Sequence, residues 1–129
     1  MDAFDADILI FLAKEDPRGD RVEPLLSESD PEDPPIGSVI LISEVFGQPL
    51  ERMHDLETER LLGILARLEL KDVDRDIAEA AARLRAKYRL RLPDAIHLAT
   101  AIVWGAARFH TNNSKDFGPH ITELEVVLA

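Results

Sequence analysis

The sequence contains no cysteine. Disulfides, thiolate catalysis and cysteine-ligated zinc sites are therefore excluded. Long apolar runs are also absent, because segments 6–13 and 38–43 are both shorter than a membrane-spanning helix. The opening residues, MDAFDAD, are acidic and lack the basic stretch that begins a secretory signal. These absences lead us to expect a cytoplasmic protein.

Several catalytic motifs are missing as well. Neither Ser38 nor Ser43 lies in a Ser-x-x-Lys or Gly-x-Ser-x-Gly arrangement, so both are expected to cap local structure rather than act as nucleophiles. His110 and His120 are not spaced as in the zinc-binding motif H-E-x-x-H. The glycine-rich phosphate loop G-x-x-x-x-G-K-[ST] is absent, which disfavours phosphoryl transfer with a small molecule as the function.

Positive charge is scarce. The chain has 15 Lys and Arg against 25 Asp and Glu, which gives a formal net charge of −10. This deficit argues against nucleic acid, since binding there depends on neutralising phosphates. The charge is uneven, however: residues 28–34 are acidic and contain no base. A bound cation would reverse the sign of a carboxylate cluster, and an acidic surface also suits a basic partner protein.

The pattern of apolar segments predicts one α/β domain over residues 1–129. The length suits a single domain, and 46% hydrophobic residues suffice for a core. Strands are expected at 2–5, 38–42, 70–73, 108–111 and 125–128. Helices are expected at 7–13, 20–26, 44–53 (interrupted at Gly47 and Pro49), 55–68, 74–87 and 93–104, with a loop at 27–37. Asp20, Asp55 and Asp74 are expected to cap the helices that begin beside them. Because strands and helices alternate, we predict a parallel sheet with helices on both faces.

Acidic and amide side chains stand beside these apolar segments, where a lone carboxylate is costly to desolvate. The candidate site residues are Asp5, Glu44, Asp94, Asn113 and Asp116. Three of them, Asp5, Glu44 and Asn113, follow expected strands. In open parallel sheets the functional crevice lies beyond the carboxyl ends of the strands, so we expect these side chains to meet there.

Each candidate also has a local interpretation. Asp94 and Glu44 stand in expected first turns of helices, where the helix dipole favours a carboxylate. Asp7 is expected to cap the first helix, which leaves Asp5 free to act as a ligand. His97 follows Asp94 by one turn and is expected to be a core or supporting group rather than a direct ligand.

The donor types indicate the metal. Mg²⁺ and Mn²⁺ prefer oxygen ligands, whereas His and Cys sites suit zinc. A cation held by several carboxylates activates water and neutralises charge on a phosphodiester. The residues therefore predict a site for Mg²⁺ or Mn²⁺.

These segments resemble the motifs of the PIN-domain family, and most closely its VapC-like toxin ribonucleases. FDADILI is similar to the opening motif, and Ser38 through Glu44 to the second. LPDAIHLATA resembles the third motif and is the most specific stretch. HTNNSKDF resembles the last, and the four follow the family's order along nearly the whole chain.

The resemblance implies a Rossmann-like sheet of about five strands and a metal-dependent endoribonuclease that acts as the toxin of a type II toxin–antitoxin pair. Asp5, Glu44 and Asp94 would be the principal metal-binding and catalytic acids. Asp116 would be the fourth acid, with Asn113 beside it at the metal. The resemblance also implies a homodimer, an RNA substrate and a cognate antitoxin that blocks the acidic pocket.

The sequence departs from the family pattern at two positions. Asp7 stands where Asn, Ser or Thr is common, and Asn113 fills a position that is acidic in some members. A non-catalytic binding module with the same fold is therefore the alternative function. Three basic residues flank the expected site, as phosphate ligands or as ordinary surface charge: Arg89, Arg91 and Lys115.

Overall fold

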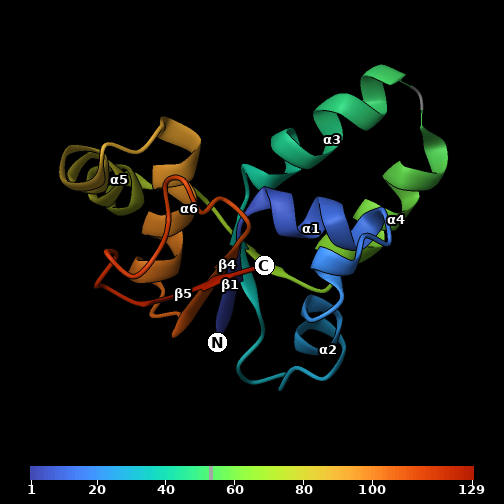
Figure 1. The fold of residues 1–129 in the computed structure, drawn as a ribbon, viewed down its shortest axis with the longest axis horizontal. Coiled ribbons are helices and arrows are strands. Elements are labelled where there is room, and N and C mark those ends of the chain that lie inside the picture. The colour runs from blue at the N-terminus through green and yellow to red at the C-terminus, as the bar shows by residue number, and fades with distance from the viewer. Residues whose placement is uncertain (53) are drawn as a thin grey trace.

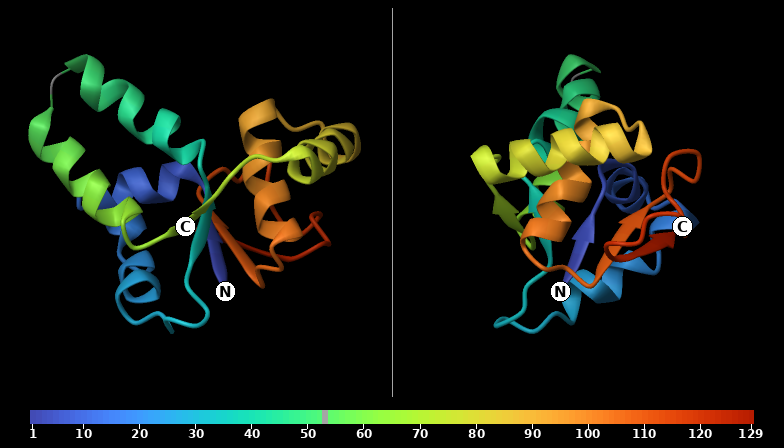
Figure 2. Two further views of the ribbon diagram at one scale, coloured as in Figure 1. Left: turned by 180° about the vertical axis from the view of Figure 1, so that it is seen from behind. Right: turned by 90° about the vertical axis from the view of Figure 1, so that its left-hand side faces the viewer.

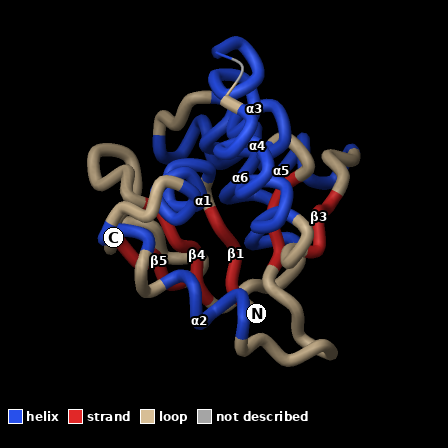
Figure 3. Tube along the Cα trace, turned by 90° about the vertical axis from the view of Figure 1, so that its right-hand side faces the viewer, coloured by secondary structure: helices blue, strands red, loops and turns tan. Residues whose placement is uncertain are grey.

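The computed structural model describes residues 1–52 and 54–129. Its strands form one five-stranded sheet in the order β3-β2-β1-β4-β5, and each adjacent pair is parallel. Figure 3 shows β5, β4 and β1 side by side, with β3 farther to the right. The strands are β1 (Asp2–Phe4), β2 (Ile36–Ser38), β3 (Glu69–Lys71), β4 (Arg108–Thr111) and β5 (Glu125–Leu128). The predicted fold class, a parallel α/β sheet of about five strands, is confirmed.

Helices cover both faces of the sheet (Figures 1 and 2). They are α1 (Ala6–Ala13), η1 (Pro17–Gly19), α2 (Val22–Ser27), α3 (Leu41–Arg52), α4 (Asp55–Leu65), α5 (Arg75–Tyr88) and α6 (Leu92–Val103). Helices α5 and α6 pack on one face, and α1 to α4 pack on the other. Side chains in a strand alternate between faces, so Ala3 joins the core under α6 while Phe4 joins the core under α1.

Strand β1 lies at the centre of the sheet, and the direction of chain progression reverses beside it. The chain runs from β1 outward to β2 and β3, then returns to the other side of β1 to form β4 and β5. Phe4 pairs with His110, and the Asp5 N–H donates to the His110 carbonyl at 2.9 Å. The carboxyl ends of β1 and β4 therefore form a topological switch point, the usual place for a site in such sheets.

The strand expected at 38–42 is wrong in its bounds. The strand ends at Ser38, and α3 begins at Leu41. The buried positions Leu41, Val45 and Pro49 recur at helical spacing, while Ile42 is 43% exposed. Burial of one helical face overrides the β-branched composition of the segment.

Gly47 and Pro49 do not interrupt helix α3. Pro49 lies inside the helix and is buried. A helical proline removes one backbone hydrogen bond, and its packing in the core offsets that loss. The last residue of the expected segment, Met53, lies outside the described residues.

Helix starts were predicted with mixed success. Asp74 caps α5, because its side chain accepts from the Ile77 N–H at 2.9 Å. The expected caps at Asp20 and Asp55 are wrong, since Arg21 and His54 hold those positions without side-chain capping bonds. Within residues 1–52 and 54–129, no helix combines the length and apolar character that a membrane crossing requires.

Candidate metal and nucleic-acid site

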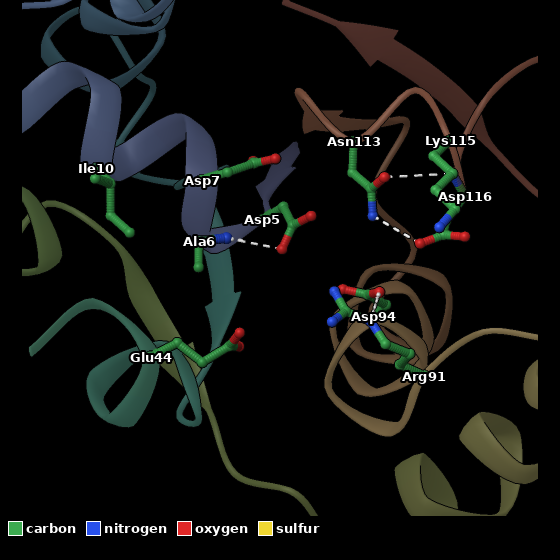
Figure 4. Close-up of a pocket in the computed structure, with 10 residues that line it drawn as sticks. All are labelled: Asp5, Ala6, Asp7, Ile10, Glu44, Arg91, Asp94, Asn113, Lys115 and Asp116. Atoms are coloured by element: carbon green, nitrogen blue, oxygen red, sulfur yellow. Dashed lines mark hydrogen bonds and ion pairs between the residues drawn. The ribbon is translucent and has the colours of Figure 1, made fainter. Parts of the chain in front are cut away.

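A pocket of about 580 Å³ opens at the switch point, beyond the carboxyl ends of β1 and β4. The acidic and amide residues that line it come from four separate stretches of chain (Figure 4). They are Asp5, Asp7, Glu44, Asp94, Asn113 and Asp116. All five residues proposed from the sequence therefore face one pocket, together with Asp7.

Asp5 follows β1 directly and is 5% exposed. One carboxylate oxygen accepts from the Ala6 N–H at 2.8 Å, which makes Asp5 the N-cap of α1. The other accepts from the Thr111 hydroxyl at the end of β4, also at 2.8 Å. Burial raises the pKa of Asp5, although His97, Thr111 and the Ala6 N–H oppose that rise.

The expected division of roles between Asp5 and Asp7 is wrong, since Asp5 caps the helix. Asp7 reaches back to the loop after β4, where its Oδ2 accepts from the Asn112 N–H at 3.1 Å. Its Oδ1 is buried without a hydrogen-bond partner among the described residues. Burial and repulsion from Asp5 raise the pKa of Asp7 to about 6.

Glu44 reaches the pocket from the first turn of α3 rather than from the end of a strand. Its side chain is 33% exposed. The carboxylate forms a hydrogen bond with Nε2 of His97, a residue of α6 whose side chain is fully buried. His97 is thus a supporting group, as expected, but its contact is with Glu44 rather than with its helical neighbour Asp94.

Asp94 stands in the first turn of α6 with its side chain 8% exposed. Burial raises its pKa, and repulsion from Asp116 and Glu44 adds to the rise. Arg91, which is 79% exposed, opposes it through an ion pair at 3.4 Å from Nε to Oδ2. Asp94 is therefore a buried carboxylate whose paired cation lies mostly in solvent.

Asn113 and Asp116 lie in the loop after β4 and bind each other. The Asn113 side-chain amide donates to Asp116 Oδ2 at 3.0 Å, and its carbonyl accepts from the Asp116 N–H at 3.3 Å (Figure 4). This pairing fixes both side chains at the pocket wall. Lys115 lies between them and also lines the pocket.

The donor set fits a hard divalent cation, because the described residues that line the pocket offer carboxylate and amide oxygens but no sulfur or imidazole. Burial is the main cause of the raised pKa values of Asp5, Asp7 and Asp94, and repulsion from neighbouring carboxylates adds to each rise. Among residues 1–52 and 54–129, no three acidic or His side chains are already gathered as a metal-binding group. Binding an ion would therefore require these side chains to turn toward the pocket centre.

The sequence identified the acids but not the two side-chain contacts that hold Asp5 and Glu44. Thr111 is not among the predicted site residues, yet its hydroxyl fixes Asp5. Its position at the end of a strand, directly before the polar loop, was the available signal. The contact of His97 with Glu44 had no local signal, because 53 residues separate the two.

The chain belongs to the PIN-domain family, whose model matches residues 3–117. Solved structures agree with this assignment. A chain in a toxin–antitoxin complex from Klebsiella pneumoniae has 30% identity and a TM-score of 0.76, with 98% of this chain and 96% of that chain covered. The resemblance to toxin-associated PIN domains is therefore confirmed.

Two more distant structures share the fold. One is VapBC2 from Rickettsia felis bound to a fragment of its promoter DNA, with 20% identity, a TM-score of 0.77 and coverage of 99% and 98%. The other is DNA-bound VapBC from Salmonella typhimurium, with 22% identity, a TM-score of 0.76 and coverage of 98% and 96%. No match was found among curated proteins.

Proposed function

We propose that this PIN-domain protein is a metal-dependent endoribonuclease that hydrolyses RNA phosphodiester bonds, and that it is the toxin of a toxin–antitoxin pair. The observation that carries the proposal is the convergence of Asp5, Glu44, Asp94 and Asp116 on one pocket at the switch point of the sheet. Clustered carboxylates in a partly closed pocket repel each other and favour a neutralising cation.

Asp5, Glu44, Asp94 and Asp116 would hold Mg²⁺ or Mn²⁺, with the Asn113 carbonyl as an additional oxygen donor. When bound, the cation supplies Lewis-acid polarisation of the phosphodiester and an acidified water nucleophile. The chain holds its own part of the site in place through two contacts. Thr111 fixes the orientation of Asp5, and the Asn113 amide fixes that of Asp116.

Two cations in the pocket wall are suited to RNA phosphates. Arg91 and Lys115 line the pocket on the side of α6 and the loop after β4, across from the carboxylates of Asp5 and Glu44 (Figure 4). Phosphate contacts supply most of the affinity of a protein for nucleic acid. Arg89, the third basic residue considered, is not among the residues that line this pocket.

The partner part of the proposal follows from the complexes to which the chain is similar. We propose a homodimer and a cognate antitoxin that places a basic side chain in the acidic pocket. The net charge of −10 favours such a partner by electrostatic complementarity.

The direct test is cleavage of a fluorescent RNA oligonucleotide with Mg²⁺ or Mn²⁺. We expect Asp94→Asn to lower the rate by about 100-fold or more, since it removes a charged oxygen donor. Asp72→Asn is the matched control, because Asp72 is exposed and lies outside the pocket. Cleavage by Asp94→Asn at the wild-type rate would remove Asp94 from the mechanism.

A non-catalytic binding module is the second candidate. It is favoured by the pairing of three pocket acids with protein groups: Glu44 with His97, Asp94 with Arg91, and Asp116 with Asn113. If the wild-type protein fails to cleave RNA at any metal concentration while remaining folded, the module replaces the enzyme as the best assignment.

A further inference from the structure

His97 is a buried polar residue that contacts a residue of the pocket wall but does not itself line the pocket. It lies on α6, and its side chain is 0% exposed. Burying an imidazole costs free energy unless its nitrogens form hydrogen bonds, whereas an apolar side chain would fill the same space without that cost.

One ring nitrogen of His97, Nε2, makes both of its polar contacts with the carboxylates. Nε2 forms a hydrogen bond with Glu44 Oε1 and lies 4.0 Å from Asp5 Oδ1. The other ring nitrogen, Nδ1, is buried without a partner among the described residues. The polar function of the ring is therefore directed entirely toward the two carboxylates.

Glu44 depends on this contact more than Asp5 does. Asp5 is held by the Thr111 hydroxyl and the Ala6 N–H. In the described part of the chain, His97 is the sole hydrogen-bond partner of the Glu44 carboxylate. A glutamate on a partly exposed helical turn has considerable side-chain freedom, so its direction is set by this bond.

We infer that His97 is a positioning residue, which holds the Glu44 carboxylate at the pocket edge beside Asp5 for cation binding. This inference rests on the proposed function. Hydrogen-bonding groups that orient a metal ligand change metal affinity or activity by about 10- to 100-fold when they are removed. His97 has that role toward Glu44, from a helix that also carries Asp94.

The test is Mn²⁺ affinity, measured by calorimetry on the whole chain without RNA. We expect His97→Leu to weaken Mn²⁺ binding by about 10- to 100-fold. His97→Gln should recover most of the affinity, because its amide nitrogen lies near the position of Nε2. His97→Asn should not, since its amide nitrogen corresponds to Nδ1 and does not reach Glu44.

A double-mutant cycle separates positioning from a general structural role. In a Glu44→Gln background, His97→Leu should have little further effect on Mn²⁺ affinity, because the residue acts through Glu44. His110→Leu is the matched control. His110 is also buried, its Nε2 bonds Asp2 Oδ1 at 2.8 Å, and its Nδ1 has no partner in the described residues. Its loss should lower the Tm but leave Mn²⁺ affinity within about twofold of wild type, since groups that touch no ligand couple weakly to it.

The outcomes separate the two proposals. If His97→Leu binds Mn²⁺ with wild-type affinity, the role of His97 is overturned while the proposed function stands. The same conclusion follows if His97→Leu weakens Mn²⁺ binding equally in the wild-type and Glu44→Gln backgrounds. If His97→Leu does not fold, the comparison of His97→Gln with His97→Asn decides, and equal affinities would overturn the inference. A wild-type protein that binds no Mn²⁺ would overturn the proposed function and this inference with it.

Discussion

Asp5 serves a helix and the pocket with the same carboxylate. One oxygen caps α1 and the other receives the Thr111 hydroxyl, while the group still lines the pocket. The sequence led us to expect Asp7 as the cap of this helix and Asp5 as a free ligand. The structure gives the cap to Asp5 and leaves Asp7 with an unpartnered buried oxygen.

Asp7 should therefore make the metal-free protein less stable as the pH rises. Its folded-state pKa of about 6 lies above the ordinary 3.8, so the folded state favours the protonated form. That contribution is complete below the ordinary value and is lost as the pH rises through about 6. Asp7→Asn removes the charge and keeps an acceptor for the Asn112 N–H. In EDTA we expect it to be more stable than wild type by about 1 kcal/mol at about pH 8, with the difference shrinking toward about pH 4.

Urea unfolding at several pH values measures this difference. Asp16→Asn is the control of opposite sign, because bonds from Arg18 lower the pKa of Asp16 to about 2. The stability from Asp16 is present above the ordinary value of 3.8 and is lost as the pH falls toward 2. Its effect should stay constant between about pH 5 and 8. A pH-independent effect of Asp7→Asn would contradict the assignment.

Two basic side chains of the pocket should act on RNA binding. We expect Arg91→Gln and Lys115→Gln each to raise the KM for RNA by about tenfold with little change in kcat, because each loses a phosphate contact made throughout the reaction. Arg89→Gln is the control, since Arg89 is exposed and does not line the pocket. Cleavage kinetics at constant salt compare the two pocket variants with this control. An equal KM for all three variants would argue against phosphate contacts at the pocket.

At the scale of elements, helix α3 shows how burial decides between competing local signals. The β-branched residues Val39, Ile40 and Ile42 lie at or just before its start, and Pro49 stands within it, yet it is a helix from Leu41 to Arg52. The buried positions on one face recur at helical spacing, and that spacing was present in the sequence. Composition favoured a strand, and the amphipathic period was the more reliable indicator.

Two glycines, one packed against α1 and one on an open face of α4, should respond in opposite ways to substitution by alanine. A Cβ at Gly19 would lie 2.6 Å from the Leu12 backbone nitrogen, so Gly19→Ala should destabilise the protein by about 1–3 kcal/mol. A Cβ at Gly63, within α4, would meet nothing within 4 Å. Gly63→Ala should stabilise by about 0.5–1 kcal/mol through helix propensity. Urea unfolding measures both, and a stable Gly19→Ala would show that the contact relaxes easily.

At the scale of the whole molecule, cation binding should be coupled to folding. The acidic pocket joins segments from β1 to the loop after β4, so an ion that bridges them binds only the folded chain. At a Mn²⁺ concentration of about 100 times its Kd, we expect about 2.7 kcal/mol of added stability. Thermal unfolding with Mn²⁺, against KCl at matched ionic strength, measures the effect. No stabilisation at millimolar metal would favour the non-catalytic module.

Most of the fold could be predicted because its signals are local. Alternating strands and helices gave the parallel sheet, and the cap at Asp74 and the strands at 108–111 and 125–128 were placed correctly. The acids of the pocket were also found, because carboxylates beside apolar segments are recognisable one segment at a time. The errors at 38–42 and at Asp7 came from choosing between two local interpretations without knowing the neighbouring element.

The sequence by itself determined the class of fold and identified the acidic residues that line the pocket. Tertiary structure decided which of these groups touch. Thr111 holds Asp5 across 106 residues and His97 holds Glu44 across 53. A local sequence pattern indicates which face of a segment is buried. The two side-chain contacts depend instead on β4 lying beside β1 and on α6 packing against the sheet. Strand order therefore turned separate carboxylates into one pocket.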